Sequence, residues 1–301
     1  SDFVFKNNAE KLLWVPPSRA YYEPTGAFKD SQHFSKTLVF SSWEMVPRML
    51  ASLLSYEAER KTVGVLAKRN DDKEIRYFKE GNKRYPIPKL RFAVKEGTPN
   101  TMTLFCLLYP SRFLAELYNP IDCMNRELSL KDIEKEIKQK LIGKLERLKT
   151  TDSGDVDKRW YYLAPMFMDG KGDVSAWLSA DPISDYLDEN EKQGQKMFKT
   201  HWEALKSVYF ENCYPNKNSL GRQPDDLVSV LTTMAIASPA VCMYRAYTRY
   251  GATPQNAMNL GSKISRVFMN YMNSPEATAV IEVCYGKKDD AHWIDVLNYC
   301  K

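Results

Sequence analysis

The residues best suited to a chemical task form a basic stretch with interleaved aromatic rings at positions 60–95. This stretch holds twelve Lys or Arg against four Asp or Glu, whereas the whole chain of 301 residues has a formal net charge of +5. Cations that neutralise phosphates, next to rings that can stack on bases, are typical of a nucleic-acid surface. A solvated loop whose rings pack inward is the alternative. The cations for which we predict nucleic-acid contacts are Arg69, Arg76, Lys79, Lys83, Arg84 and Arg91, and the interleaved rings are Tyr77, Phe78, Tyr85 and Phe92.

The sequence offers no residue set for catalysis or metal binding. The three His and six Cys are widely spaced without a C-x-x-C pair, which argues against a zinc site and against a disulfide framework. A phosphate-binding G-x-x-x-x-G-K-[ST] loop is absent, because Gly143-Lys144, Gly170-Lys171 and Gly286-Lys287 are followed by Leu, Gly and Lys. We therefore expect no catalytic residue, no metal and no cofactor in this chain by itself.

Two apolar runs in the first 120 residues resemble buried strands. Residues 37–41 are apolar between polar neighbours, and apolar residues then recur at helical spacing over 44–60. Residues 101–109 form a second apolar run that ends at Pro110, and a short strand is expected at 75–78. Strand followed by helix is the beginning of an α/β layer. We expect residues 1–120 to form a partial α/β lobe.

The remainder of the chain, residues 121–301, is expected to be a mainly α helical domain. Ser129 and Asp132 resemble a capping box ahead of an apolar stripe with charged residues on its other face. A linker is possible at residues 150–158. Three prolines each follow a Ser or Thr, as at the first position of a helix. The expected helices are residues 174–187, 195–210, 225–237, 239–250, 254–272, 275–285 and 290–300.

One short motif resembles a known family. Lys36-Thr37-Leu38-Val39-Phe40-Ser41-Ser42-Trp43, followed by an amphipathic helix, resembles the start of the second RecA-like lobe in superfamily 2 helicases, most closely the Swi/Snf-type translocases. The resemblance implies that Ser41, Ser42 and Trp43 lie at the end of a buried strand, near the nucleic-acid path. It covers about the first 60 residues and implies that the α/β lobe expected at residues 1–120 is a partial RecA-like lobe.

The rest of the chain departs from that family, because the phosphate-binding loop and the late arginine motif are missing. The resemblance therefore implies an interior fragment of an ATP-dependent helicase or DNA translocase, inactive by itself. ATP and magnesium are implied for the parent only, and the implied partners are nucleic acid, most readily DNA, and the missing first RecA-like lobe.

A protein of a different class is also compatible with the sequence, namely a non-enzymatic helical scaffold or protein-interaction module. The longest uncharged run, residues 227–244, contains Ser, Thr and Pro and is expected to be a broken, buried helix pair, since a membrane span needs about 20 strongly apolar residues. We expect no membrane contact and a cytoplasmic location.

Overall fold

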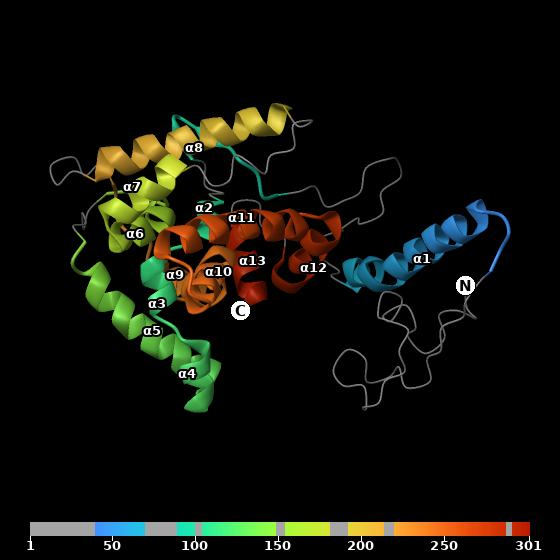
Figure 1. Ribbon diagram of the computed structural model, residues 1–301, viewed down its shortest axis with the longest axis horizontal. Helices are drawn as coiled ribbons and strands as arrows, with labels where there is room; N and C mark the ends of the chain where they lie inside the picture. The colour runs from blue at the N-terminus through green and yellow to red at the C-terminus, as the bar shows by residue number, and fades with distance from the viewer. Residues whose placement is uncertain are drawn as a thin grey trace. The chain divides into compact units, whose positions relative to one another are not determined.

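The computed structural model describes residues 40–69, 89–99, 104–148, 154–180, 192–213, 220–286 and 291–301, with only the backbone described at 63–69 and 192–195. The chain divides into two compact units, which are described separately (Figure 1). The first unit comprises residues 1–87 and 275–284, and the second comprises residues 88–274 and 285–301.

The first unit contains helix α1, Met45–Arg69, and nearly all of helix α12, Pro275–Tyr285. The helix predicted over 44–60 is confirmed and continues to Arg69. Of the apolar residues that predicted it, Met45, Met49 and Leu53 are exposed, whereas Leu50 and Leu54 are half-buried and Ala58 is buried. Of the strand expected at 37–41, residues 37–39 lie outside the described residues, and residues 40–41 form no strand.

The prediction of an α/β lobe with a RecA-like sheet is wrong. The described residues contain a single sheet of two short antiparallel strands, β1 (Val94–Lys95) and β2 (Thr98–Pro99), and are otherwise mainly helical. The run at 101–109, expected to be a strand, contains helix α2, Phe105–Leu108. A run that is apolar at every position can be buried as a strand or as a helix, and periodicity does not separate the two. The short strand expected at 75–78 lies outside the described residues.

Helix α2 lies at the centre of the second unit, and all four of its residues are buried. It contacts α6, α10, α11 and α13, whose bounds are given below. Backbone carbonyls at such a site need partners, because water does not reach them. The hydroxyl of Ser238 donates to the Cys106 carbonyl at 3.0 Å, and that of Ser262 donates to the Leu108 carbonyl at 3.1 Å.

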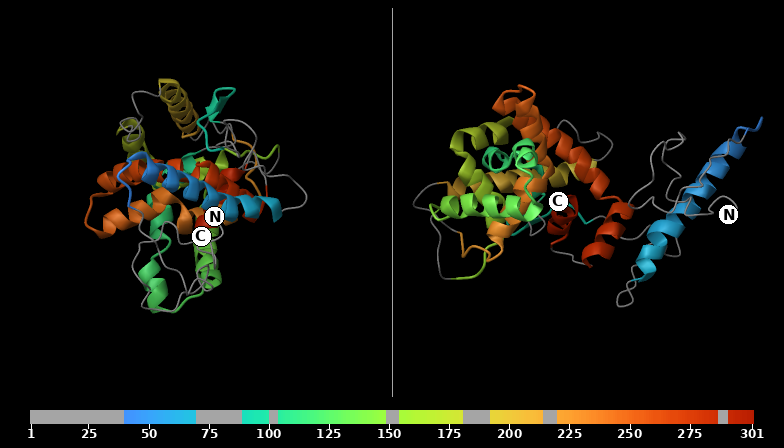
Figure 2. Two further views of the ribbon diagram at one scale, coloured as in Figure 1. Left: turned by 90° about the vertical axis from the view of Figure 1, so that its right-hand side faces the viewer. Right: turned by 90° about the horizontal axis from the view of Figure 1, so that it is seen from below.

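The other helices of the second unit pack around this centre (Figures 1 and 2). Helix α9 contacts α3, α5, α6, α10 and α13, whereas α8 contacts both strands of the hairpin. Their bounds are α3 Arg112–Glu116, α4 Pro120–Asn125, α5 Leu130–Leu145, α6 Trp160–Asp169, α7 Lys171–Ala180, α8 Lys192–Asn212, α9 Leu227–Ala237, α10 Pro239–Arg249, α11 Pro254–Met272 and α13 His292–Cys300.

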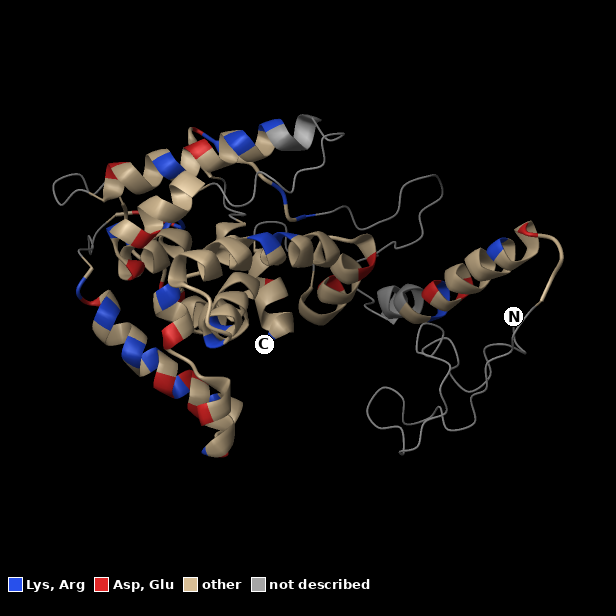
Figure 3. Cartoon of the chain, viewed as in Figure 1, with Lys and Arg blue, Asp and Glu red and all other residues tan. Residues whose placement is uncertain are grey.

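Helix α5 has the amphipathic character that its sequence predicts. The capping box is present, with the Ser129 hydroxyl accepting from the Asp132 amide and the Asp132 carboxylate accepting from the Ser129 amide. Charged residues follow its outer face (Figure 3). The buried side of the helix consists of Ile133, Ile137, Leu141 and Leu145.

Prolines begin the late helices α10 and α11 where the sequence predicts, and glycines follow the ends of α10 and α12. Pro239 and Pro254 stand at the first helical position, and the Thr253 hydroxyl accepts from the Asn256 amide. Gly251 and Gly286 have φ of 87° and 80°, which a side chain at either position would disfavour.

The end of α6 is fastened to the segment that follows α2 through one carboxylate. Asp169 accepts hydrogen bonds from the hydroxyls of Tyr109 and Ser111 and from the backbone amides of Arg112 and Phe113, at 2.6–3.2 Å. Burial raises the pKa of Asp169 to about 6, an effect that these four donors oppose.

Among the described residues no single helix is long and apolar enough to cross a membrane. Helices α9 and α10 satisfy that criterion only when taken together, and they are bent by 46° at their junction.

Candidate functional site

The predicted residues Ser41, Ser42 and Trp43 lie together at the beginning of α1 in the first unit. The Trp43 amide donates to the Ser41 hydroxyl at 3.1 Å, and the Trp43 carbonyl accepts from the Val46 amide in the first helical turn. All three residues are exposed, and the indole of Trp43 is 75% exposed. This turn therefore presents a large aromatic ring to solvent.

The predicted cations are only partly covered by the structure. Arg69 is the last residue of α1, and its side chain is not described. Arg91 is exposed and belongs to the second unit, so it is not brought together with Trp43 within one unit. The remaining predicted cations lie outside the described residues, namely Arg76, Lys79, Lys83 and Arg84.

Phe92, one of the rings expected to be available for stacking on bases, is buried instead. Its ring lies 5.0 Å from that of Phe198 and 5.4 Å from that of His201, and the Arg266 guanidinium lies over it at 4.7 Å. The rings of Tyr77, Phe78 and Tyr85 lie outside the described residues. Phe92 therefore follows the alternative interpretation of the basic stretch, in which the aromatic rings pack inward.

The ring of Phe92 belongs to an aromatic cluster in the core of the second unit. Successive ring centroids in this cluster lie between 4.8 and 6.4 Å apart, at angles typical of aromatic packing. The members of the aromatic cluster are Phe92, Phe105, Trp177, Phe198, His201 and Trp202.

His201 is a buried histidine held by one hydrogen bond. Its Nδ1 lies 2.7 Å from the Ala93 carbonyl, which can only accept, so Nδ1 carries the proton. Its Nε2 is buried and has no partner among the described residues. Burial lowers the pKa of His201 to about 4, and the Ala93 carbonyl opposes this effect. The ring is therefore neutral at pH 7.

Asn273 holds the backbone of Leu90, two residues before Phe92. The Leu90 amide donates to Asn273 Oδ1 at 2.9 Å, and Asn273 Nδ2 donates to the Leu90 carbonyl at 2.9 Å. Asn273, at the end of α11, thus makes the pair of backbone hydrogen bonds that a neighbouring β-strand would make with Leu90. Together with the Ala93–His201 bond, this pair fixes the path of residues 90–93.

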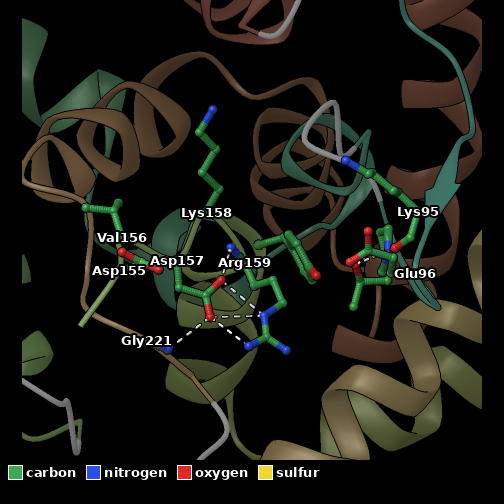
Figure 4. A pocket seen from close by; sticks show the side chains of 11 residues that line it. Lys95, Glu96, Asp155, Val156, Asp157, Lys158, Arg159 and Gly221 are labelled. Atoms are coloured by element: carbon green, nitrogen blue, oxygen red, sulfur yellow. Dashed lines mark hydrogen bonds and ion pairs between the residues drawn. The ribbon is translucent and has the colours of Figure 1, made fainter. Parts of the chain in front are cut away.

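A cleft of about 570 Å³ opens between the hairpin and two loops of the second unit (Figure 4). Its volume is within the range of about 300–1,000 Å³ typical of small-molecule sites. One side consists of the hairpin residues 95, 96, 98 and 99, and the other of residues 155–159, Tyr162 and Gly221.

The two loops of the cleft are joined by their backbones. The Arg222 amide donates to the Asp155 carbonyl at 3.0 Å, and the Asp157 amide donates to the Arg222 carbonyl at 2.8 Å. The Trp160 indole nitrogen donates to the Gly221 carbonyl at 2.9 Å. Residues 154–158, part of the possible linker at 150–158, are thus tied to a segment far along the chain.

Asp157 and Arg159, both in the first of these two loops, form an ion pair (Figure 4). Both Nε and Nη2 of Arg159 donate to the Asp157 carboxylate, with the shortest contact at 2.7 Å, and the Gly221 amide donates to it at 3.0 Å. Burial raises the pKa of Asp157, but the hydrogen bonds from Arg159 and the Gly221 amide outweigh burial and lower it overall. Asp157 is therefore a fixed, charged anchor of the loops.

Tyr162 lines the cleft, and its buried hydroxyl has no hydrogen-bond partner among the described residues. The residue is only 2% exposed, and burial raises the pKa of its hydroxyl, which stays protonated. Its neighbour Tyr161 is different, because its hydroxyl donates to Asp226 at 2.6 Å. A buried hydroxyl without a partner costs free energy.

The sequence did not point to the cleft, because its two loops are 61 residues apart at the Trp160–Gly221 contact. The signal closest to it is the Trp160-Tyr161-Tyr162 run next to the charged residues 157–159, which is unusually aromatic for the first turn of a helix.

Metal ligation has no support in the described part of the chain, where no group of three or more His, Cys, Asp or Glu is arranged around a common point. Comparisons of the chain with protein-family models, with curated proteins and with solved structures found no match.

Proposed function

We propose that this chain is the helical, nucleic-acid-contacting part of an ATP-dependent helicase or DNA translocase. In this role it contributes contacts and structure and does not hydrolyse ATP itself, while ATP and magnesium are bound by other parts of the parent. The protein would then work in the cytoplasm on DNA.

The observation that carries the proposal is the exposed turn formed by Ser41, Ser42 and Trp43. This turn is the end of the motif that resembles helicases, and it leads directly into α1. An indole that is 75% exposed leaves a large apolar surface in water, and stacking on a base would remove that surface from water.

The segment at residues 89–93 supports the proposal from the second unit. Its backbone is fixed at Leu90 by Asn273 and at Ala93 by His201, and the Phe92 side chain is buried. The Arg91 side chain, one of the predicted cations, is exposed between these fixed points. A cation on an ordered backbone loses less conformational entropy when it meets a phosphate than one on a free chain.

Binding of fluorescently labelled single- and double-stranded DNA across a salt series tests the proposal. We expect binding that weakens steeply with salt, because each neutralised phosphate of a single strand contributes about 0.7 to the logarithmic slope. A variant carrying Arg76→Glu, Lys83→Glu and Arg84→Glu should lower that slope by about 2. Trp43→Ala should weaken single-strand binding by about 1–3 kcal/mol, the contribution of one stacked base.

The matched control carries Lys131→Glu, Lys135→Glu and Lys140→Glu on the exposed face of α5, which changes the net charge equally. Equal loss of affinity in the two triple variants would show that only net charge matters and would refute the assignment of the basic stretch. Absence of any binding at low salt would refute the nucleic-acid role itself.

A protein-interaction module is the second candidate, and one observation in the second unit favours it. Helix α11 carries exposed apolar side chains at Leu260, Ile264, Val267 and Tyr271, spaced four, three and four residues apart. This spacing places them on one face of the helix, as in helices that pack against a partner. If the chain does not bind DNA, the protein-interaction module is the better-supported proposal.

A further inference from the structure

Helix α11 presents a row of apolar side chains that the fold leaves exposed. Leu260, Ile264, Val267 and Tyr271 are 40%, 42%, 57% and 72% exposed, and we call these four residues the α11 stripe. Their spacing places them on one side of the helix over a length of about 16 Å. Neighbouring exposed apolar side chains indicate a docking surface more strongly than the same residues scattered singly.

The opposite side of α11 is fixed in the core, so the helix cannot rotate to bury the stripe. The Ser262 hydroxyl donates to the Leu108 carbonyl at 3.1 Å and accepts from the Trp177 indole nitrogen at 2.8 Å. Gly261 lies so close to α10 that a Cβ there would be 3.2 Å from the Ala240 carbonyl oxygen. The α11 stripe is therefore a preformed surface, which a partner does not have to order.

The charges that border the stripe have one sign. Residues 227–275, which include α9, α10 and α11, contain four Lys or Arg and no Asp or Glu. Lys263 stands three residues from Leu260 and four from Val267, so it borders the stripe. Arg266 follows one turn later on the same flank. A partner with carboxylates facing this flank is attracted to it.

A second copy of the chain does not fit this surface. An antiparallel pair of α11 helices would bring the two basic flanks together, and a parallel pair would leave both flanks without a carboxylate. Like charges placed against each other in an interface oppose association. The occupant therefore has a different sequence from α11.

Nucleic acid is also attracted to cations, but the stripe suits it poorly. Leu260, Ile264 and Val267 are branched aliphatic residues, which do not offer the flat ring on which a base stacks. Side chains spaced four and three residues apart fit instead between the side chains of a second helix. The composition of the stripe thus favours a helix over a nucleic-acid strand.

We propose that the α11 stripe is the docking surface for one amphipathic helix of a partner protein, with apolar residues against the stripe and Asp or Glu along the flank that faces Lys263 and Arg266. A helix of about 11–15 residues spans the stripe at 1.5 Å per residue. This inference rests on the second candidate function above, the protein-interaction module, and does not depend on DNA binding.

Two synthetic peptides of about 16 residues, each held helical by a covalent bridge between side chains, test the proposal. Both carry Leu along one face, and they differ only in having Glu or Lys along the flanks of that face. Fluorescence anisotropy with the full chain measures both affinities. We expect the Glu peptide to bind about 10-fold more tightly than the Lys peptide, the effect of a few exposed ion pairs, and the difference to shrink as salt is added.

Ile264→Gln combined with Val267→Gln removes the centre of the stripe. Both positions are exposed and Gln is a good helix former, so this double variant should unfold at the temperature of the wild type or above it. It should weaken binding of the Glu peptide by at least about 10-fold. The matched control is Met124→Gln combined with Ile142→Gln, exposed apolar residues of α4 and α5, which should leave that affinity unchanged.

Lys263→Glu tests the flank separately from the apolar face. The variant should bind the Glu peptide less tightly and the Lys peptide more tightly than the wild type does, because the charge of the flank is reversed. Loss of affinity for both peptides would show that Lys263 supports the helix without selecting the partner, and would overturn the assignment of an acidic partner.

Other results would also overturn the proposal. Equal affinities of the two peptides, or no binding of either, would contradict an acidic helix. A dimer in sedimentation experiments that the Ile264→Gln and Val267→Gln variant abolishes would assign the stripe to a second copy. Binding of oligonucleotides or of anionic lipid vesicles that the same variant weakens would assign it to nucleic acid or to a membrane surface.

The two proposals can fail independently. Binding of the Glu peptide without binding of any DNA would support the docking surface and contradict the helicase role. Binding of DNA that depends on Trp43, with neither peptide bound, would overturn the docking surface and leave the helicase role standing.

Discussion

His201 lies within the aromatic cluster, where its neutral form is the stable one. Water around an imidazolium would be replaced by the rings of Phe92 and Phe105, which cannot solvate the charge. The Ala93 carbonyl accepts the one proton that the neutral ring carries. The residue therefore acts as a packing side chain with one directed hydrogen bond.

The pH dependence of stability follows from this environment. The folded-state pKa of His201 is about 4, below the ordinary value of 6.5 that applies to the unfolded chain. Between these values the unfolded chain binds a proton that the folded chain does not, so stability falls as pH falls from 6.5 to 4. At about 1.4 kcal/mol for each pH unit, the full loss is about 3 kcal/mol.

The measurement is the difference in unfolding free energy between the wild type and His201→Phe, taken by urea denaturation from pH 7 to pH 4. We expect the wild type to lose about 3 kcal/mol relative to the variant. Asp169, whose pKa is raised to about 6, acts in the opposite direction, but it is present in both proteins and cancels. A difference that is constant with pH would show that His201 titrates normally.

At the scale of elements, the pairing of residues 155–157 with residues 221–222 requires a glycine. A Cβ at Gly221 would lie 2.5 Å from the Asp155 carbonyl oxygen and 3.3 Å from the Asp157 Cβ. Both neighbours belong to the backbone pairing of the loops, so neither can move aside without breaking it. The glycine is what allows the two loops to approach.

Gly221→Ala should therefore lower the unfolding free energy by about 1–3 kcal/mol, the usual cost of forcing extra volume into a packed site. Gly143→Ala is the control, because a Cβ at that position in α5 would meet nothing within 4 Å. It should raise stability by up to about 1 kcal/mol through helix propensity. Equal urea midpoints for Gly221→Ala and the wild type would contradict the close approach of the loops.

The elements that the sequence predicted well are those with local signals. Pro239, Pro254 and Gly251 mark helix ends through their own φ preferences, and the Ser129–Asp132 box needs only three residues of spacing. Helix α2 was mistaken for a strand because its burial is complete and its sequence carries no period. Two of its buried carbonyls are satisfied by Ser238, which precedes α10, and by Ser262 of α11, both from much later in the chain.

The candidate site was less predictable than the helices for the same reason. Trp43 could be selected by its local motif, and the structure places it in an exposed turn in place of the expected strand end. The cleft joins a hairpin, an expected linker and a loop at Gly221, and no local pattern connects these three. Residues that meet only through tertiary structure leave no periodic signal in the sequence.

At the scale of the whole molecule, the second unit contains its own complete core. Every member of the aromatic cluster lies between residues 92 and 202, within that unit. The Asp169 network and the paired loops of the cleft are also internal to it. A unit whose contacts are internal can fold by itself.

We expect a fragment of residues 88–301, which holds the second unit together with residues 275–284 of the first, to unfold in one cooperative transition and to keep the near-ultraviolet circular dichroism of the buried tryptophans Trp177 and Trp202. Near-ultraviolet circular dichroism during a urea titration measures both properties. A gradual transition without that signal would show that the first unit is needed for the core of the second.

The Asn273 pair also determines how the second unit responds to mechanical force. Tension applied on the amino-terminal side of Leu90 acts there on two hydrogen bonds to one side-chain amide. If they part, the next point of resistance is the Phe92 ring, which must be drawn out from between Phe198 and Arg266. Residues 90–93 thus resist force in two steps. A pull from the amino-terminal side must break the two hydrogen bonds of Asn273 and then extract the Phe92 ring before the force reaches the helices.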